Sequence, residues 1–273
     1  MVREIDGTAS PLAFFGAELR RARNQVGLSQ EQLGQRIGYS PAMVGKVETG
    51  DRAPTHDLAQ RCDQALDARG LLARVYELAR RWDGGYPSWF AGWIDRERQA
   101  SSLCWWEPLL VPGLLQTADY ARAILAVEPH ASEDELEEIV RARIERQAIL
   151  DRPGPPSLWV IVDETVLHRR IGNTKVMYDQ LSRVVTLANR PTITIQVVPD
   201  DVGAHVGLLG GFAIASGNGA DTVYMESPDK GHTTELPSVA AKLTETFNIL
   251  RGEALSQAAS RELIMKVAEE SWT

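Results

Sequence analysis

Apolar residues recur at helical spacing in the first third of the chain, and two short segments show this most clearly. Residues 30–37 and residues 41–48 each contain two apolar residues that are three or four positions apart. The pairs are Leu33 with Ile37, and Val44 with Val47. Residues at this spacing share one face of a helix. The pattern predicts two short amphipathic helices that pack through these faces.

Residues that favour helix ends flank both segments. Ser29 and Ser40 can each cap a helix, because a serine hydroxyl accepts a hydrogen bond from a backbone N–H of the first turn. Gly38 can adopt the left-handed conformation common just after a helix, and Pro41 fits a first turn. Pro54 prevents the second helix from continuing. We therefore expect a helix, a tight turn and a second helix.

This arrangement resembles the helix-turn-helix of phage-repressor-like (XRE) DNA-binding domains. The matching residues are Gln30, Gly34, Gly38, Val44 and Val47. That family more commonly has alanine at the position of Gly34, so the first helix is expected to be weaker here by about 1 kcal/mol. The alternative interpretation is an ordinary helical hairpin. The resemblance implies an all-α DNA-binding domain.

Helical geometry then indicates which residues could meet DNA. If Val44 and Val47 face inward, Ala42 and Lys46 face outward, on the helix that lies in the major groove in this family. Ala42 is small enough to touch a thymine methyl group, and Lys46 can reach the O6 and N7 acceptors of guanine. Residues near helix starts and loop exits can contact phosphates. For Arg23, a solvated surface position explains the residue equally well. The candidate DNA-contacting residues are Arg23, Gln30, Ser40, Pro41, Ala42, Lys46 and Arg52.

Three further helices complete the first domain. They are predicted over residues 12–24, after a cap at Thr55, and over residues 71–82. Residues 1–10 are expected to be disordered or loosely attached. Residues 83–87, Asp-Gly-Gly-Tyr-Pro, have the composition of a linker. We therefore divide the chain into a helix-turn-helix domain, residues 1–82, and a second domain, residues 83–273.

The second domain mixes helical and strand patterns. Apolar or alternating segments predict strands over residues 103–111, 158–162, 192–198, 212–216 and 222–226. Helices are predicted over residues 88–100, 113–127, 133–150, 164–168, 173–188, 236–250 and 255–269. This predicts an α+β fold with a mainly antiparallel sheet that carries helices on one face. The strand order does not follow from the pattern.

Tryptophans are concentrated around the domain boundary. Five of the seven lie within residues 82–106. Trp89 and Trp93 are four positions apart and would share one helix face. We favour a packed seam that joins the domains, but the rings could instead line a ligand or partner groove. The candidate ligand- or partner-binding residues are Trp89, Trp93, Trp105 and Trp106.

The net charge of −8 is unevenly divided between the domains. Residues 1–81 contain 12 basic and 10 acidic residues, a net charge of +2, which leaves 17 basic and 27 acidic residues, net −10, in the remainder. Non-specific DNA affinity should therefore be weak and salt-dependent. No apolar run approaches the roughly 20 residues of a membrane span, and the N-terminus lacks a signal-peptide pattern. We expect a cytoplasmic protein.

The sequence offers no catalytic or metal-binding motif. The five histidines are scattered without metal-ligand spacing, and Walker, nucleophile-elbow and zincin motifs are absent. Asp163 and Glu164 follow a strand and could do acid–base chemistry, although helix capping explains them more simply. Cys62 lies in an apolar helical pattern and is expected to be a buried thiol. We expect no enzyme activity, no cofactor and no metal.

Over nearly its whole length, the chain resembles actinobacterial-type, antitoxin-like helix-turn-helix regulators. The residues that carry this resemblance are Glu107-Pro108, Val111–Ala121 (VPGLLQTADYA), Arg146-Gln147, Asp163-Glu164, Gln180-Leu181, Val197–Pro199 and Val223–Glu226. The C-terminal domain of such regulators has no assigned activity. Genes for very small proteins that are thought to bind them commonly lie nearby. The resemblance therefore implies a small protein partner.

These observations predict a sequence-specific DNA-binding transcriptional regulator. We expect it to bind double-stranded DNA as a homodimer, with an affinity that a small protein partner modulates through the C-terminal domain. One alternative is a repressor that senses a small molecule in an aromatic pocket. Another is an antitoxin that sequesters a small protein. An enzyme fused to a DNA reader is disfavoured by the absence of catalytic motifs.

Overall fold

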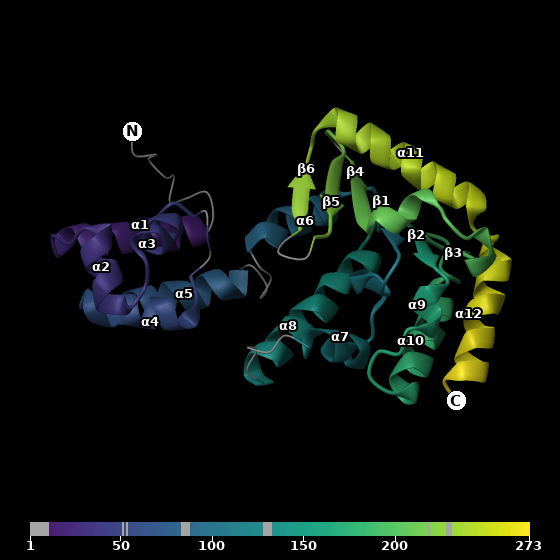
Figure 1. The fold of residues 1–273 in the computed structure, drawn as a ribbon, viewed down its shortest axis with the longest axis horizontal. Coiled ribbons are helices and arrows are strands. Elements are labelled where there is room, and N and C mark those ends of the chain that lie inside the picture. Colours follow the sequence, from purple (N-terminus) through teal and green to yellow (C-terminus); the bar gives the residue numbers. More distant parts are fainter. Residues whose placement is uncertain are drawn as a thin grey trace. The chain divides into compact units, whose positions relative to one another are not determined.

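The computed structural model divides the chain into two compact units, Met1–Ala91 and Gly92–Thr273 (Figure 1). Its described residues are 11–50, 52, 54–82, 88–127, 133–217, 219–227 and 231–273. The predicted disordered start, residues 1–10, and the predicted linker, residues 83–87, lie outside this part of the chain. No described helix is long and apolar enough to span a bilayer.

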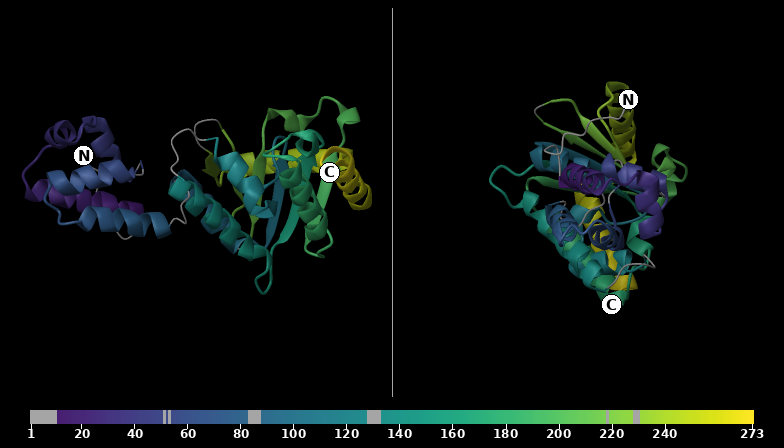
Figure 2. Two further views of the ribbon diagram at one scale, coloured as in Figure 1. Left: turned by 90° about the horizontal axis from the view of Figure 1, so that it is seen from below. Right: turned by 90° about the vertical axis from the view of Figure 1, so that its left-hand side faces the viewer.

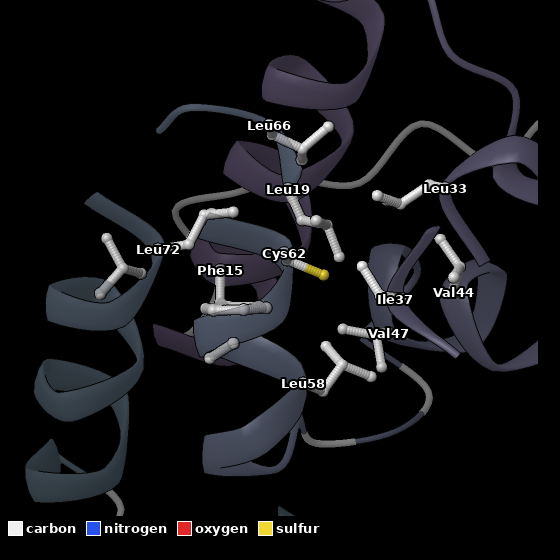
Figure 3. Packing of buried hydrophobic residues seen from close by; sticks show 12 residues of the cluster. Phe15, Leu19, Leu33, Ile37, Val44, Val47, Leu58, Cys62, Leu66 and Leu72 are labelled. Atoms are coloured by element: carbon white, nitrogen blue, oxygen red, sulfur yellow. The ribbon is translucent and has the colours of Figure 1, made fainter. Parts of the chain in front are cut away.

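The described residues before position 83 form five helices. They are α1 (Pro11–Gln25), α2 (Gln30–Ile37), α3 (Pro41–Glu48), α4 (His56–Ala65) and α5 (Leu71–Trp82). Their apolar stripes meet in one core, in which the predicted inner residues Leu33, Ile37, Val44 and Val47 are at most 2% exposed (Figure 3). Cys62 is also buried there, as predicted, and burial raises the pKa of its thiol to about 12. The helix-turn-helix packing predicted from the sequence is therefore confirmed.

The predicted caps are present at α2 and α3. Ser29 forms a capping box with Gln32, since the Gln32 N–H donates to Ser29 Oγ at 3.1 Å and Ser29 N–H donates to Gln32 Oε1 at 2.8 Å. Ser40 Oγ accepts from Met43 N–H at 3.2 Å. Gly38 has a φ of +76°, the left-handed conformation that glycine adopts without strain. These local signals fix both helix boundaries.

Two glycines lie where the backbone of the N-terminal unit is most tightly packed. A Cβ added to Gly34 would lie 2.6 Å from the Tyr39 carbonyl oxygen, so the tight contact is with the turn. Alanine, which is commoner at this position in phage-repressor-like domains, would therefore not simply strengthen α2. A Cβ added to Gly16 of α1 would lie 2.6 Å from the Val47 carbonyl oxygen. The close approach of α1 to α3 at Gly16 was not predicted from the sequence.

The C-terminal unit is α+β, as predicted, around a six-stranded mixed sheet. Its strands are β1 (Ser102–Glu107), β2 (Ser157–Asp163), β3 (Ile193–Val198), β4 (Phe212–Ser216), β5 (Thr222–Met225) and β6 (His232–Thr234). Their order is β3-β2-β1-β4-β5-β6. Three pairings are antiparallel, and the β1–β2 and β2–β3 pairings are parallel. The long helical connections that follow β1 and β2 allow parallel pairing, because they cross back over the sheet.

Helices cover both faces of this sheet, so the expectation of one covered face was wrong (Figures 1 and 2). On one face, Trp106 and Phe212 pack with Phe247 of α11 (Pro237–Glu253). On the other, Trp105 meets Trp93 of α6 (Ser88–Gln99), with ring centroids 6.0 Å apart. The continuous apolar run in β2 is the sequence signal for a sheet covered on both faces, because polar and apolar residues do not alternate in a strand that is buried on both faces.

The remaining helices mostly match their predicted positions. They are α7 (Ala118–Leu125), α8 (Glu133–Arg146), α9 (Thr165–His168), α10 (Thr174–Leu187) and α12 (Gln257–Ser271). The helix predicted over 113–127 begins only at Ala118, and a 3-10 turn, Gly113–Leu115, precedes it. Glutamine amides hold this turn: Gln147 Nε2 donates to the Gly113 carbonyl at 2.9 Å, and Gln180 Nε2 donates to the Leu115 carbonyl at 2.9 Å.

Candidate DNA-binding site

The outward surface of α3 consists of the residues predicted to meet DNA. Ser40, Pro41, Ala42 and Lys46 are exposed, whereas Val44 and Val47 on the opposite side are buried. Small side chains dominate this surface, so a duplex could approach the helix backbone closely. Lys46 adds a positive charge with a long reach.

Two further residues border this surface. Arg52, predicted to contact phosphate, is exposed beyond the end of α3. Thr49, in contrast, is half-buried, and its hydroxyl donates to the Gly45 carbonyl at 3.0 Å and lies 3.1 Å from the Lys46 carbonyl. Thr49 therefore caps the end of α3 with its own side chain.

The last residue of α3, Glu48, carries a fully buried carboxylate. Glu48 is 0% exposed, and it receives the guanidinium of Arg23 with an Nε–Oε1 distance of 2.5 Å and an Nη2–Oε2 distance of 2.9 Å. Arg20 Nε lies 3.4 Å from Glu48 Oε2, and Gln30 Nε2 donates to the same oxygen at 2.8 Å. A charge removed from water is tolerated only when it is paired and hydrogen-bonded in this way. The network joins α1, α2 and α3.

In this network, Arg23 and Gln30 bond Glu48, a contact that does not follow from the sequence alone. Arg23 has five N–H groups, and two donate to Glu48 while Nη1 donates to Asn24 Oδ1 at 2.9 Å and to the Leu28 carbonyl at 2.7 Å. Its part in holding α1 against α3 is therefore clear, whereas a phosphate contact stays a prediction. The Gln30 amide lies beside Gly45, where an added Cβ would be 3.2 Å from Gln30 Oε1.

The sequence did contain a signal for Glu48. The residue is four positions after Val44 and one after Val47, so it falls on the same buried stripe of α3. A carboxylate in an apolar stripe requires a basic partner. The arginines of α1 were available for that role, but only the three-dimensional packing shows which of them reaches it.

Three of the four tryptophans proposed for ligand or partner binding lie in the interior of the C-terminal unit. Trp93 and Trp106 are 0% exposed and Trp105 is 4% exposed. Each indole N–H is bonded: Trp93 donates to Glu97, Trp105 to Glu107, and Trp106 to the Gly207 carbonyl. These three rings are packed within one unit. The side chain of Trp89 lies outside the described residues.

Charged groups accompany these buried rings. Arg146 of α8 lies over the Trp105 ring, 5.9 Å from its centroid, and its Nε is 2.8 Å from Glu97 Oε1. Burial raises the pKa of Glu107 to about 8, and the nearby charge of Glu226 adds to this, while the hydrogen bond from Trp105 opposes it. Glu107 therefore keeps its proton in the folded protein at a pH where an exposed glutamate has lost it.

Asp163 bonds the backbone at the start of α9, but the N-cap position is Glu164, whose side chain makes no capping bond, so capping by this pair is only partly what the structure shows. Asp163 Oδ1 accepts the N–H of Thr165 at 3.0 Å at the start of α9. His205 Nε2 lies 3.1 Å from Asp163 Oδ2, and His205 Nδ1 accepts the N–H of Gly207 at 3.2 Å. Both ring nitrogens are thus engaged in holding the loop after β3.

We predict that Arg23→Ala lowers the free energy of unfolding of the N-terminal unit by about 3 kcal/mol, because it leaves Glu48 buried with weaker compensation. Urea unfolding followed by far-ultraviolet circular dichroism measures this change. Arg21→Ala is the control, since the Arg21 side chain is 67% exposed, and its removal should change stability by no more than about 0.5 kcal/mol. Equal effects of the two substitutions would contradict the role assigned to Glu48.

We predict that Glu107→Gln becomes increasingly stable relative to the wild type as the pH rises. The unfolded chain releases the Glu107 proton near the ordinary value of 4.5, but the folded chain releases it only near 8. Between pH 4.5 and about 8, the folded state therefore binds more protons than the unfolded state. The contribution of Glu107 to the free energy of unfolding of the wild type falls as the pH increases through this range. Melting temperatures across that range measure the difference. Glu262→Gln, at an exposed position of α12, should give no such trend.

Two family models match separate parts of the chain. Residues 15–75 match a family described as "Helix-turn-helix domain", and residues 90–266 match "Domain of unknown function (DUF5753)". Searches of curated proteins and of solved structures find no match to the chain. The match to residues 90–266 covers more than half of the chain. The chain therefore belongs to the DUF5753 family, and a helix-turn-helix DNA-binding domain precedes its DUF5753 domain.

Proposed function

We propose that this protein is a sequence-specific transcriptional regulator that reads an operator through the outer surface of α3. The observation that carries the proposal is the exposure of Ala42 and Lys46 on a helix whose opposite side is fully buried. A reading helix needs this arrangement, because base contacts require side chains held at fixed positions. The match of residues 15–75 to a helix-turn-helix domain supports the same conclusion.

The proposed regulator acts as a homodimer. Ala42 and Lys46 provide few directional contacts to bases, so one reader has limited specificity. The charge of residues 1–81 is only +2, which keeps non-specific attraction to phosphates weak. Two readers on successive half-sites, about one helical turn apart, would supply the missing affinity and specificity. The acidic C-terminal unit then serves for assembly and control.

Control of the proposed regulator comes from a small protein that binds the C-terminal unit. Binding would change the distance between the two DNA-binding units or their freedom to move, and would thereby change the affinity for the operator. An antitoxin that sequesters the same small protein is a second candidate function, in which DNA binding only autoregulates. A small-molecule sensor with a tryptophan pocket has less support, because Trp93, Trp105 and Trp106 are enclosed by protein.

We predict that Lys46→Ala relaxes base preference at one position of each half-site by about 1–3 kcal/mol. High-affinity duplexes are first selected from random DNA with the wild-type protein. Binding of every single-base variant is then measured for both proteins. Lys266→Ala, at an exposed position of α12, is the matched control and should leave base preference unchanged. Unaltered discrimination by Lys46→Ala would count against α3 as the reading helix.

We predict that a small protein encoded beside this gene co-purifies with the full chain and shifts its operator affinity. Fluorescence anisotropy of labelled operator DNA, with and without the added protein, measures the shift. Co-purification without any shift would favour sequestration. If the neighbouring protein does not bind at all, this mode of control must be abandoned.

A further inference from the structure

Helix α6 is the element through which the chain enters the C-terminal unit. From Gly92 onward it belongs to that unit, and residues 83–87 separate its start at Ser88 from the end of α5 at Trp82. The N-terminal unit is therefore tethered to the rest of the protein through this helix. How firmly α6 is held determines how far the N-terminal unit can reach.

A buried carboxylate holds the inner side of α6. Glu97 is 0% exposed, its Oε1 lies 2.8 Å from Arg146 Nε of α8, and its Oε2 accepts the indole N–H of Trp93 at 3.2 Å. Burial raises the pKa of the Glu97 carboxyl, while the charge of Arg146 and the bond from Trp93 oppose this rise. Because a buried charge is tolerated only with such a partner, Glu97 and Arg146 depend on each other to keep α6 docked.

Other contacts hold α6 along its face and at its end. The ring of Trp93 packs against Trp105 of β1 and Tyr224 of β5, with centroid distances of 6.0 and 5.6 Å. Just after the helix ends, Arg152 Nη2 donates to the Ala100 carbonyl at 2.9 Å, which satisfies an acceptor that a helix end leaves without a partner. Side chains from distant parts of the C-terminal unit thus fix α6 in one place.

The docking of α6 shortens the tether of the N-terminal unit. The connection from residue 82 to residue 88 spans at most about 20 Å. If α6 left its place and unfolded, the free connection would run from residue 82 to residue 102, where β1 begins, and could span about 70 Å. Docking therefore reduces the reach of the tether by roughly a factor of three.

The length of this tether matters when two N-terminal units bind one operator. Once the first unit is bound, the second reaches its half-site at an effective concentration that the tether sets. A short tether reaches only half-sites at a matching separation, whereas a long one reaches half-sites at several separations. The choice among operators that differ in half-site spacing therefore depends on whether α6 is docked.

We propose that Glu97 is a positioning residue for operator reading: with Arg146 it keeps α6 docked, and the docked helix restricts the dimer to one separation of its half-sites. This inference rests on the proposed function, since it requires two N-terminal units that read one operator. It gives a residue buried in the C-terminal unit a part in DNA specificity.

Two substitutions in the full chain that each remove one negative charge from α6 test the docking. Glu97→Gln leaves the buried Arg146 without its partner charge, whereas Asp95→Asn, the matched control, changes a side chain that is 71% exposed. Hydrogen exchange followed by mass spectrometry should show the α6 amides of Glu97→Gln exchanging about tenfold faster than those of the wild type. The amides of Asp95→Asn should exchange at the wild-type rate.

The separation of half-sites tests the positioning role. Half-sites selected with the wild type are placed in duplexes that differ by single-base-pair insertions between them, and binding is measured by fluorescence anisotropy. Wild type and Asp95→Asn should prefer one separation, and Glu97→Gln should lose about tenfold of that preference while binding a single half-site as the wild type does. A merely structural role would leave the spacing preference unchanged.

A double variant and a second single variant complete the test. Glu97→Gln with Arg146→Met should restore both slow exchange and the spacing preference, because replacing both partners of a buried pair leaves no unpaired charge. If circular dichroism shows Glu97→Gln to be unfolded, Arg152→Ala decides, since it removes the bond at the end of α6 and keeps the buried pair. It should loosen the helix and weaken the spacing preference together.

Three results would overturn the positioning role. They are a wild type without a preferred separation, a loosened α6 that keeps the wild-type spacing preference, and a folded double variant that restores neither property. If the wild type selects no DNA sequence, the proposed function itself fails. Small-angle X-ray scattering still tests the tether in that case, because the maximum dimension of Glu97→Gln should exceed that of the wild type, and equal dimensions would overturn the control of reach by α6.

Discussion

The burial of one carboxylate, that of Glu48, determines how α3, the proposed reading helix, is held. Helix α3 has only eight residues, too few to be stable alone in water. Its apolar stripe attaches it to the core, but apolar contacts have little directional preference. The ion pair with Arg23 and the hydrogen bond from Gln30 have defined geometry, and they join α3 to two other helices. The orientation of the outer surface of α3 therefore follows from a group that never meets solvent.

This arrangement separates support from recognition within a very short helix. Val44, Val47 and Glu48 are committed to the interior, whereas Ala42 and Lys46 remain available on the outside. Substitutions on the outer side should change the stability little, so under the proposed function they can alter base preference alone. Substitutions on the inner side should change both the stability and the orientation of the proposed reading surface, because Val44, Val47 and Glu48 attach α3 to the core. Gly16 belongs to the inner group, since it lets α1 approach the carbonyl groups at the end of α3.

The N-terminal unit was predictable from the sequence because its signals are local. The caps at Ser29 and Ser40 and the left-handed Gly38 each depend on neighbours within a few positions. The partners of Arg23 were not predictable in the same way, since Glu48 lies 25 positions away. In the C-terminal unit, continuous apolar runs and alternating segments predicted five strands, but strand pairing depends on segments distant in the sequence, so the strand order could not be predicted. Strand β6, with three exposed or half-buried residues, has no apolar pattern to detect.

The 3-10 turn at Gly113–Leu115 depends on groups that are distant in the sequence. Its carbonyl oxygens are bonded by Gln147 and Gln180, which lie 34 and 65 positions away from their acceptors. Because a buried carbonyl without a donor is costly, these bonds can stabilise the turn only after α10 and the segment that follows α8 have docked. Closing such long loops is slow compared with helix formation. The turn should therefore be among the last parts of the C-terminal unit to become ordered during folding, and among the first to exchange its amide hydrogens when those helices loosen.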